Sequence, residues 1–140
     1  MLAAMATLGV ATACKDAPQA APAPTPAIDA DLMDVTVPRL RQLYADRKYT
    51  VTQVVKWHLD RIDRYNPVYG AIETVLRDDA LAAAAREDAE SGGTHGPLWG
   101  VPIVIKANTS VKGHVTTAGW EGFARPGHEL LAPKDATIVA

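Results

Sequence analysis

A short apolar run that ends on a lysine limits the folds open to this chain. Residues 101–105 read VPIVI, and Lys106 follows directly. An uninterrupted apolar run of this length is typical of a strand buried on both faces, in a sheet covered by helices. Pro102 fits such a strand only near its start, because proline cannot donate a hydrogen bond within a sheet. The run therefore predicts a buried strand at 101–105 that delivers Lys106 to its end.

Helical and extended segments alternate before this run. The sequence TVTQ at 50–53 has the form of a capping box, and apolar residues follow it at helical spacing. Asn66-Pro67 should end that helix, because the residue before a proline avoids the helical region. Alternating helix and strand units are typical of α/β domains. In chain order we predict a helix capped by Thr36, a helix after the capping box, a strand at 71–75, a helix opened by Asp78 and Asp79, and the strand at 101–105.

The N-terminus divides into two segments of unusual composition. Residues 1–13 are apolar and uncharged, which suits the apolar region of a signal peptide but is too short to span a membrane. Residues 10–14 read VATAC and are similar to a bacterial lipoprotein cleavage box, in which the cysteine is lipidated. Residues 14–35 are rich in proline and alanine, as in extended, disordered linkers. We therefore predict a signal peptide at 1–13, lipidation of Cys14, a linker at 14–35, and a domain at 36–140 exported to the periplasm or cell envelope and anchored to the membrane by lipid.

The composition of the chain argues against several classes of function. The net charge is -2 and no basic run occurs, so nucleic acid is not an expected partner. Cys14 is the only cysteine, which excludes an internal disulfide framework and a cysteine-rich zinc site. The histidines His58, His95, His114 and His128 do not form a metal-binding motif. We therefore expect no metal in this chain.

Lys106 has two interpretations from its position alone. A lysine at the end of an apolar strand ordinarily extends its ammonium group to solvent. Alternatively, a cleft can desolvate the amine and lower its pKa, so that the neutral form accepts a proton during catalysis. The residues of the strand leave both interpretations open, and the first is the more ordinary.

Residues 96–108, which include Lys106, read GPLWGVPIVIKAN. This block resembles the amidase signature family, which commonly has G-P-L-x-G-[IV]-P-[IV]-x-x-K-[DE]-N. Residues 112–119 read KGHVTTAG and are similar to the family's G-x-x-T-T-x-G block. Residues 135–139 read DATIV and are similar to the D-A-x-x-V that opens its next helix. The resemblance covers residues 36–140, and Ala107 departs from it by replacing an acidic residue.

The resemblance implies the N-terminal part of a mixed sheet flanked by helices, and an amidase with a Ser–cis-Ser–Lys triad. Lys106 would be the base and would act through the bridging serine, while the other serine forms an acyl-enzyme with a small-molecule amide. Thr116, Thr117 and Gly119 would line the substrate cleft, although the threonines could equally be β-branched residues that end a strand. No metal or organic cofactor is implied.

The serines needed for such a triad are not found in these residues. Ser91 and Ser110 are the only serines, and neither lies in a glycine- and serine-rich block like the one that carries the family's catalytic pair. Family order places that block after residue 140, so we expect these 140 residues alone to lack amidase turnover. The N-terminal segments fit a second hypothesis equally well, a non-catalytic exported lipoprotein that acts as a small binding module. An in-frame continuation rich in serine and glycine would favour the enzyme, and a stop codon the binding module.

Overall fold

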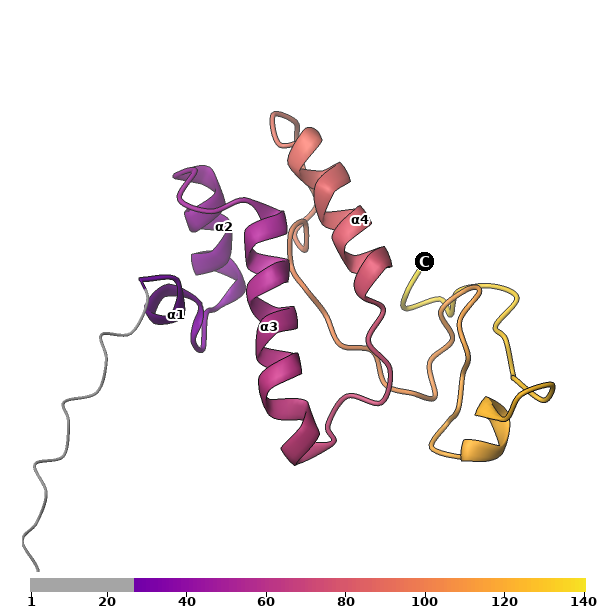
Figure 1. The fold of residues 1–140 in the computed structure, drawn as a ribbon. Coiled ribbons are helices and arrows are strands. Elements are labelled where there is room, and N and C mark those ends of the chain that lie inside the picture. The colour runs from indigo at the N-terminus through magenta and orange to yellow at the C-terminus, as the bar shows by residue number, and fades with distance from the viewer. Residues whose placement is uncertain (1–26) are drawn as a thin grey trace, which may run out of the picture.

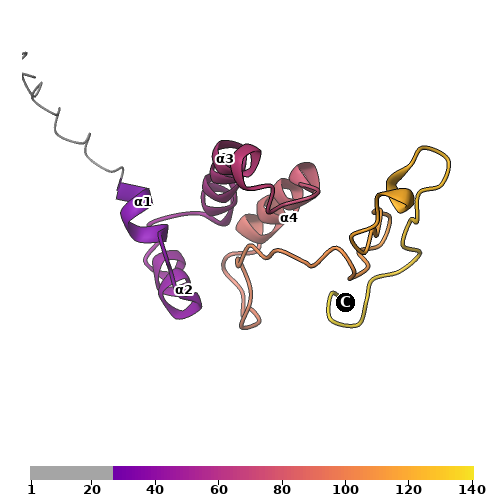
Figure 2. The ribbon, with the colours of Figure 1, turned by 90° about the horizontal axis from the view of Figure 1, so that it is seen from below.

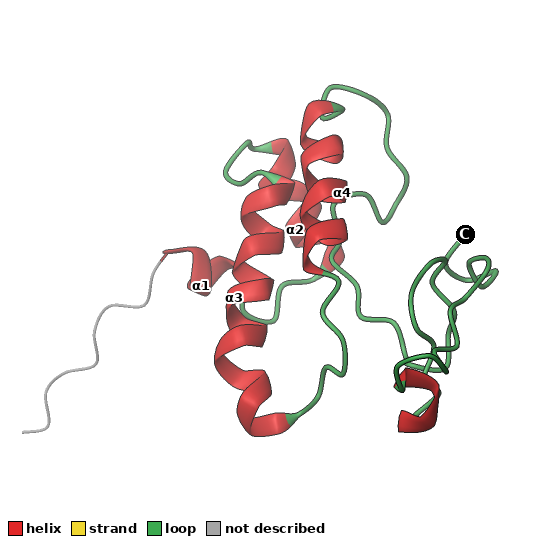
Figure 3. Ribbon diagram, turned by 45° about the vertical axis from the view of Figure 1, so that its right-hand side comes forward, coloured by secondary structure: helices red, strands yellow, loops and turns green. Residues whose placement is uncertain are grey.

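The computed structural model describes residues 27–140, and the regular structure there is helical (Figure 1). The elements are α1 (Ala27–Leu32), α2 (Val37–Ala45), α3 (Val51–Tyr69), α4 (Arg77–Ala89) and a 3-10 helix, η1 (Glu121–Ala124). In Figure 1, α3 stands between α2 and α4, and the chain beyond α4 continues as long loops. No strand occurs in the described residues, as Figure 3 shows.

Local capping signals explain where the central helices begin. Thr36 precedes α2, and its hydroxyl accepts a hydrogen bond from the Arg39 amide at 3.4 Å. The capping box before α3 is complete: Gln53 N–H donates to the Thr50 hydroxyl at 3.2 Å, and Thr50 N–H donates to the Gln53 side chain at 2.9 Å. Both predicted starts are therefore confirmed, because each depends on residues within one helical turn.

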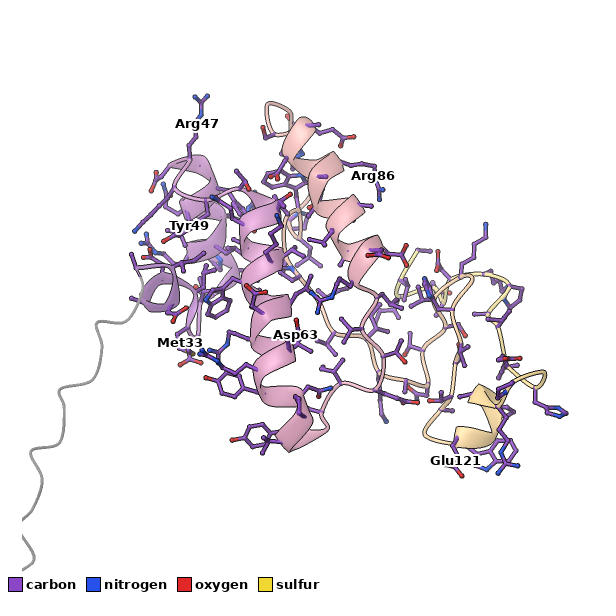
Figure 4. The ribbon with its side chains drawn as sticks, viewed as in Figure 1. Met33, Arg47, Tyr49, Asp63, Arg86 and Glu121 are labelled. Atoms are coloured by element: carbon purple, nitrogen blue, oxygen red, sulfur yellow. The ribbon has the colours of Figure 1, made fainter. Side chains whose placement is uncertain are left out.

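Helix α1 lies within residues 14–35, the segment that we predicted to be a linker. Leu32 is buried against α2 and α3, which gives this short helix a place in the core. The Tyr49 hydroxyl, labelled in Figure 4, donates to Asp31 at 2.7 Å, and the Lys48 ammonium lies 2.6 Å from the same carboxylate. The end of the segment predicted as a linker is thus held by apolar and polar contacts.

The core uses two faces of α3. One face packs against α1 and α2 through a cluster formed by Leu32, Leu40, Leu43, Val54 and Trp57. The other packs against α4 through a cluster formed by Val51, Val55, Leu59 and Ala84. The apolar stripe predicted for this helix is therefore confirmed, and it is wide enough to serve two partners. No helix described here has the length and apolarity to cross a membrane.

The predicted end of α3 at Asn66-Pro67 is wrong, because the helix runs through Pro67 to Tyr69. Gly70 ends it instead, in the left-handed conformation at φ 57° that glycine adopts without steric cost. Asn66 remains important for the connection that follows. Its side chain accepts from the Ile72 amide and donates to the Ile72 carbonyl, each at 2.8 Å.

The two predicted strands are not formed, and the mixed sheet is not found in residues 27–140. Segment 71–75 is held by the Asn66 side chain and has no partner strand in this part of the chain. Segment 101–105 is extended, but its only backbone hydrogen bond here is from Val101 to Leu98 in a turn. Ile103 and Val104 are 66% and 73% exposed, although the apolar run predicts burial. A strand requires a neighbour for its backbone groups, and the described residues supply none.

Asp88 of α4 caps the start of α3 and thereby connects the two helices. Its carboxylate accepts from the Val51 amide at 2.7 Å and the Thr52 amide at 3.1 Å. Burial acts to raise the pKa of Asp88, but hydrogen bonds from Thr52, Val51 and Thr50 outweigh it and lower the pKa below its ordinary value. The ionised carboxylate is therefore the form that the folded state favours.

We expect the helical part to lose stability as pH falls through the depressed pKa of Asp88. The group binds protons more weakly in the folded state, so its contribution is complete above its unfolded-state pKa of about 4 and is lost below it. Asp88→Asn should cost about 1 kcal/mol at pH 7, the usual scale for a lost N-terminal cap. The free energy of unfolding of this variant should also lack the part of the pH dependence that comes from Asp88. Urea unfolding followed by circular dichroism between pH 7 and pH 3 measures both effects, and equal stability at pH 7 would contradict the capping role.

Candidate functional site

A cavity of about 630 Å³ lies among three segments that follow the helices. The connection before α4, the extended segment after α4, and the next loop form its walls. In Figure 2 the extended segment passes along α3 and α4 and continues into the C-terminal loops. The polar side chains in the lining are those of Glu73, Thr74, Lys106, Thr109, His114 and Thr117.

Gly100 anchors the segment that carries Lys106. The Tyr44 hydroxyl donates to the Gly100 carbonyl at 2.7 Å, and the Gly100 amide donates to Glu87 of α4 at 3.1 Å. Burial raises the pKa of Tyr44, and the carboxylates of Glu87 and Asp88 add to this, so the phenol remains a donor. Tyr44 belongs to α2 and Glu87 to α4, so both helices that pack on α3 hold the start of segment 101–105.

Lys106 lies at the end of the extended segment, as the sequence predicts, and lines the cavity. Its side chain is exposed to solvent in this arrangement. Its carbonyl accepts from the Thr109 amide at 2.8 Å, which turns the chain immediately after the lysine. The neighbouring Ala107 carbonyl accepts from the Ala118 amide at 3.0 Å. This second bond brings the 116–119 block next to the lysine.

Thr116 and Thr117 are both buried, and only Thr117 is part of the cavity lining. The Thr117 hydroxyl donates to the Glu73 carboxylate at 3.0 Å and accepts from the Gly119 amide at 3.2 Å. Gly119 has φ 82°, which allows the tight turn that points its amide back to Thr117. Thr116 is held through its backbone, whose amide donates to Leu130 at 2.9 Å. The assignment of these residues to a substrate cleft stays a prediction.

Backbone pairing and one contact between side chains support this wall of the cavity. Val115 and Leu131 form an isolated antiparallel bridge. His114 Nε2 lies 2.9 Å from an Asp79 carboxylate oxygen, which connects the first turn of α4 to the cavity. Asp79, expected only to favour a helix start, thus also has a tertiary partner. No group of three or more metal-ligating side chains occurs within residues 27–140.

Sequence reasoning missed Glu73 as a site residue. The available signal was an acidic residue inside an otherwise uncharged segment, AIETV at 71–75. Its meaning depends on Thr117, which is distant in sequence and only the fold brings near. Ser91 and Ser110 do not line the cavity. Cys14, the predicted lipidation site, and residues 1–13, the predicted signal peptide, lie outside the described residues.

Comparisons with known proteins give the motif blocks a context. A family model described as Amidase matches residues 53–140. A glutamyl-tRNA(Gln) amidotransferase subunit of Azoarcus sp. (strain BH72) is 34% identical over 110 residues, which cover 78% of this chain and 22% of that protein. The corresponding protein of Acidothermus cellulolyticus is 36% identical over 114 residues, covering 78% and 21%. The chain thus spans about a fifth of the length of these relatives. No solved structure matches the chain.

The relatives contradict the predicted location in the periplasm or cell envelope. They are named for an enzyme that acts on glutamyl-tRNA(Gln), a component of cytoplasmic translation, and this conflicts with export. The export prediction rests on the apolar residues 1–13, the VATAC block at 10–14 and the proline- and alanine-rich segment that follows, but there is no lysine or arginine before the apolar run. A positively charged start is a regular part of secretory signals. Uncharged small residues alone are therefore a weak indicator of export.

The order of the sequence blocks and the lysine-bearing segment at the cavity agree with the family match. The match includes every residue of the cavity lining, from Leu59 to Thr117. The chain therefore belongs to the amidase signature family, whose members act on the carbon–nitrogen bonds of amides.

Proposed function

We propose that this chain provides the general base of an amide-bond hydrolase and that Lys106 is the base. The observation that carries the proposal is the position of Lys106. It ends an extended segment, lies in the 96–108 block where the family has its lysine, and lines the same cavity as Thr117. An amide substrate is accordingly the proposed small-molecule partner, and no cofactor takes part.

The proposed reaction uses a Ser–cis-Ser–Lys triad. The nucleophilic serine attacks the amide carbonyl carbon, and its proton passes through the bridging serine to the neutral amine of Lys106. The tetrahedral intermediate then expels the amine, which takes up the proton, and leaves an acyl-enzyme. Water or a second amine resolves that ester. The relatives are named amidotransferases, which is in keeping with resolution by an amine.

The proposal requires polypeptide beyond the matched segment. Neither Ser91 nor Ser110 lines the cavity, so both triad serines would come from elsewhere in the whole protein. Lys106 is exposed here, and a lysine becomes an effective base only where its ammonium form is disfavoured by desolvation or a nearby charge. We propose that the same additional polypeptide covers the cavity and removes Lys106 from water.

The product of the natural gene, with whatever its reading frame encodes on either side of these residues, tests the function. It should release amine or ammonia from members of a panel of small primary and secondary amides. A fluorophosphonate that reacts with nucleophilic serines should stop the release, whereas a chelator should not. Amide turnover that survives the fluorophosphonate and disappears with the chelator would contradict the proposal.

A further inference from the structure

Glu73 and Thr117 form a hydrogen-bonded pair in the cavity wall. The Thr117 hydroxyl donates its single proton to Glu73 Oε2 at 3.0 Å. The hydroxyl oxygen of Thr117 in turn accepts from the Gly119 amide at 3.2 Å. Thr117 is only 5% exposed, so its surroundings fix the side chain in place. The two residues come from segments on opposite sides of α4 in the sequence, and both line the cavity.

The hydrogen bonds within the pair determine what it can offer a ligand. A hydroxyl has one donor and two acceptor positions, and an ionised carboxylate has acceptors only. Thr117 has used its donor and one acceptor, so one acceptor position remains. Glu73 receives one hydrogen bond among residues 27–140, at Oε2, which leaves Oε1 available. The pair can therefore accept hydrogen bonds from a ligand but has no proton to donate.

We propose that Glu73 and Thr117 form a subsite that binds the N–H group of an amide substrate. The inference rests on the proposed amidase function for the class of ligand and on the hydrogen-bond pattern for the site. A primary or secondary amide has an N–H donor beside its carbonyl, and this donor matches the acceptors of the pair. Glu73 is exposed to solvent in this arrangement, so an amide without an N–H group would displace water from Oε1 without replacing its hydrogen bond, and this costs affinity.

The position of the pair relative to Lys106 supports this assignment. Ala118, next to Thr117, donates its amide to Ala107, next to Lys106, at 3.0 Å. The acceptor pair and the lysine therefore lie in adjacent parts of one wall, and a cavity of about 630 Å³ has room for a small amide between them. Glu73 and Thr117 would select the nitrogen side of the substrate and thereby orient its carbonyl carbon.

Binding of two matched probes to the 140-residue chain tests the subsite without turnover. Propanamide has N–H donors, and N,N-dimethylpropanamide has the same acyl group without them. The amide resonance of Gly119 in a nitrogen–proton correlation spectrum reports on the pair, because that N–H donates to Thr117. Propanamide should shift it saturably, and the dimethyl amide should bind about 10-fold or more weakly, the scale for a hydrogen bond to a charged acceptor.

Variants separate recognition by the pair from a structural role. Glu73→Gln should weaken propanamide by about 10-fold or more and leave the dimethyl amide unchanged, since only the first probe uses the charged acceptor. Thr117→Ser, which keeps the hydroxyl, should preserve discrimination between the probes, and Thr117→Val should reduce it. Thr94→Val alters an exposed threonine that does not line the cavity, and it should change neither affinity.

Three results would overturn the subsite: no saturable shift with propanamide, equal affinity for the two amides, or unchanged propanamide affinity in Glu73→Gln. Failure of the proposed catalytic function would be seen differently. Lys106→Met should leave propanamide discrimination in place, because the binding measurement involves no proton transfer. Loss of the subsite with retained Lys106-dependent turnover would likewise refute the subsite alone.

Discussion

Replacing Gly100 by alanine should lower the free energy of unfolding by about 2–5 kcal/mol, because two costs combine. Gly100 has φ 72°, and a side chain in the left-handed region costs about 1–2 kcal/mol. An added Cβ would also lie 2.6 Å from Cε2 of Tyr44, whose ring is packed in the core. Overpacking of this kind typically costs about 1–3 kcal/mol more.

Gly113 provides the matched control for this prediction. Its φ is 79°, close to that of Gly100, but a Cβ there meets no atom within 4 Å. Gly113→Ala should therefore show only the backbone cost of about 1–2 kcal/mol. Urea unfolding of both variants measures the difference, which isolates the contact with Tyr44. Equal losses would mean that Tyr44 moves aside freely and does not anchor the segment that leads to Lys106.

The sequence predicted α2, α3 and α4, but not α1, because the signals of those three helices are local. Thr36 and the box of Thr50 and Gln53 cap α2 and α3 with bonds that stay within one turn. The stripe of Val51, Val55 and Leu59 indicates burial through its spacing alone. The error at Pro67 has a local origin too. Pro67 removes one backbone hydrogen bond, but the helix continues to the Gly70 amide, which donates to the Asn66 carbonyl, and Gly70 is the stronger stop signal.

The extended segments could not be predicted in the same way. An apolar run such as 101–105 indicates a strand only if another strand is available, and no local residue specifies that partner. Within residues 27–140 the partner is missing, so Ile103 and Val104 stay exposed. In segment 71–75, the Asn66 side chain takes the hydrogen bonds of Ile72 that a neighbouring strand would otherwise make.

The candidate site likewise contains residues that the sequence predicts and residues that only the structure identifies. The family blocks locate Lys106, Thr117 and Gly119 in the sequence, and the structure brings the first two to one cavity. Glu73 has no motif, because its role comes from a contact with Thr117 that the sequence does not specify. The exposure of Lys106 also could not be read from its apolar neighbours, since they lack the cover that a buried strand would have.

The central claim is that Lys106 is the general base, and substitution of this residue should have the largest effect on amide turnover. Lys106→Met keeps most of the apolar stem and removes the amine that would accept the serine proton. Lys106→Arg keeps the positive charge, but a guanidinium group does not deprotonate in proteins and cannot act as a base. Both variants should reduce amide turnover by about 100-fold or more, the scale for a positioned acid–base group. Lys106 belongs to neither core cluster of residues 27–140, so both variants should leave the helical part intact.

The decisive measurement is kcat/KM for amide hydrolysis by the product of the natural gene, compared among wild type, Lys106→Met and Lys112→Met. Lys112 is an exposed lysine of the adjacent loop, and its backbone amide donates to Asp135. Its variant should retain most of the activity and controls for a general loss of positive charge. We expect the Lys106 variant to lose about 100-fold or more with an unchanged circular dichroism spectrum. Turnover by Lys106→Met at close to the wild-type rate would contradict the assignment of Lys106 as the base.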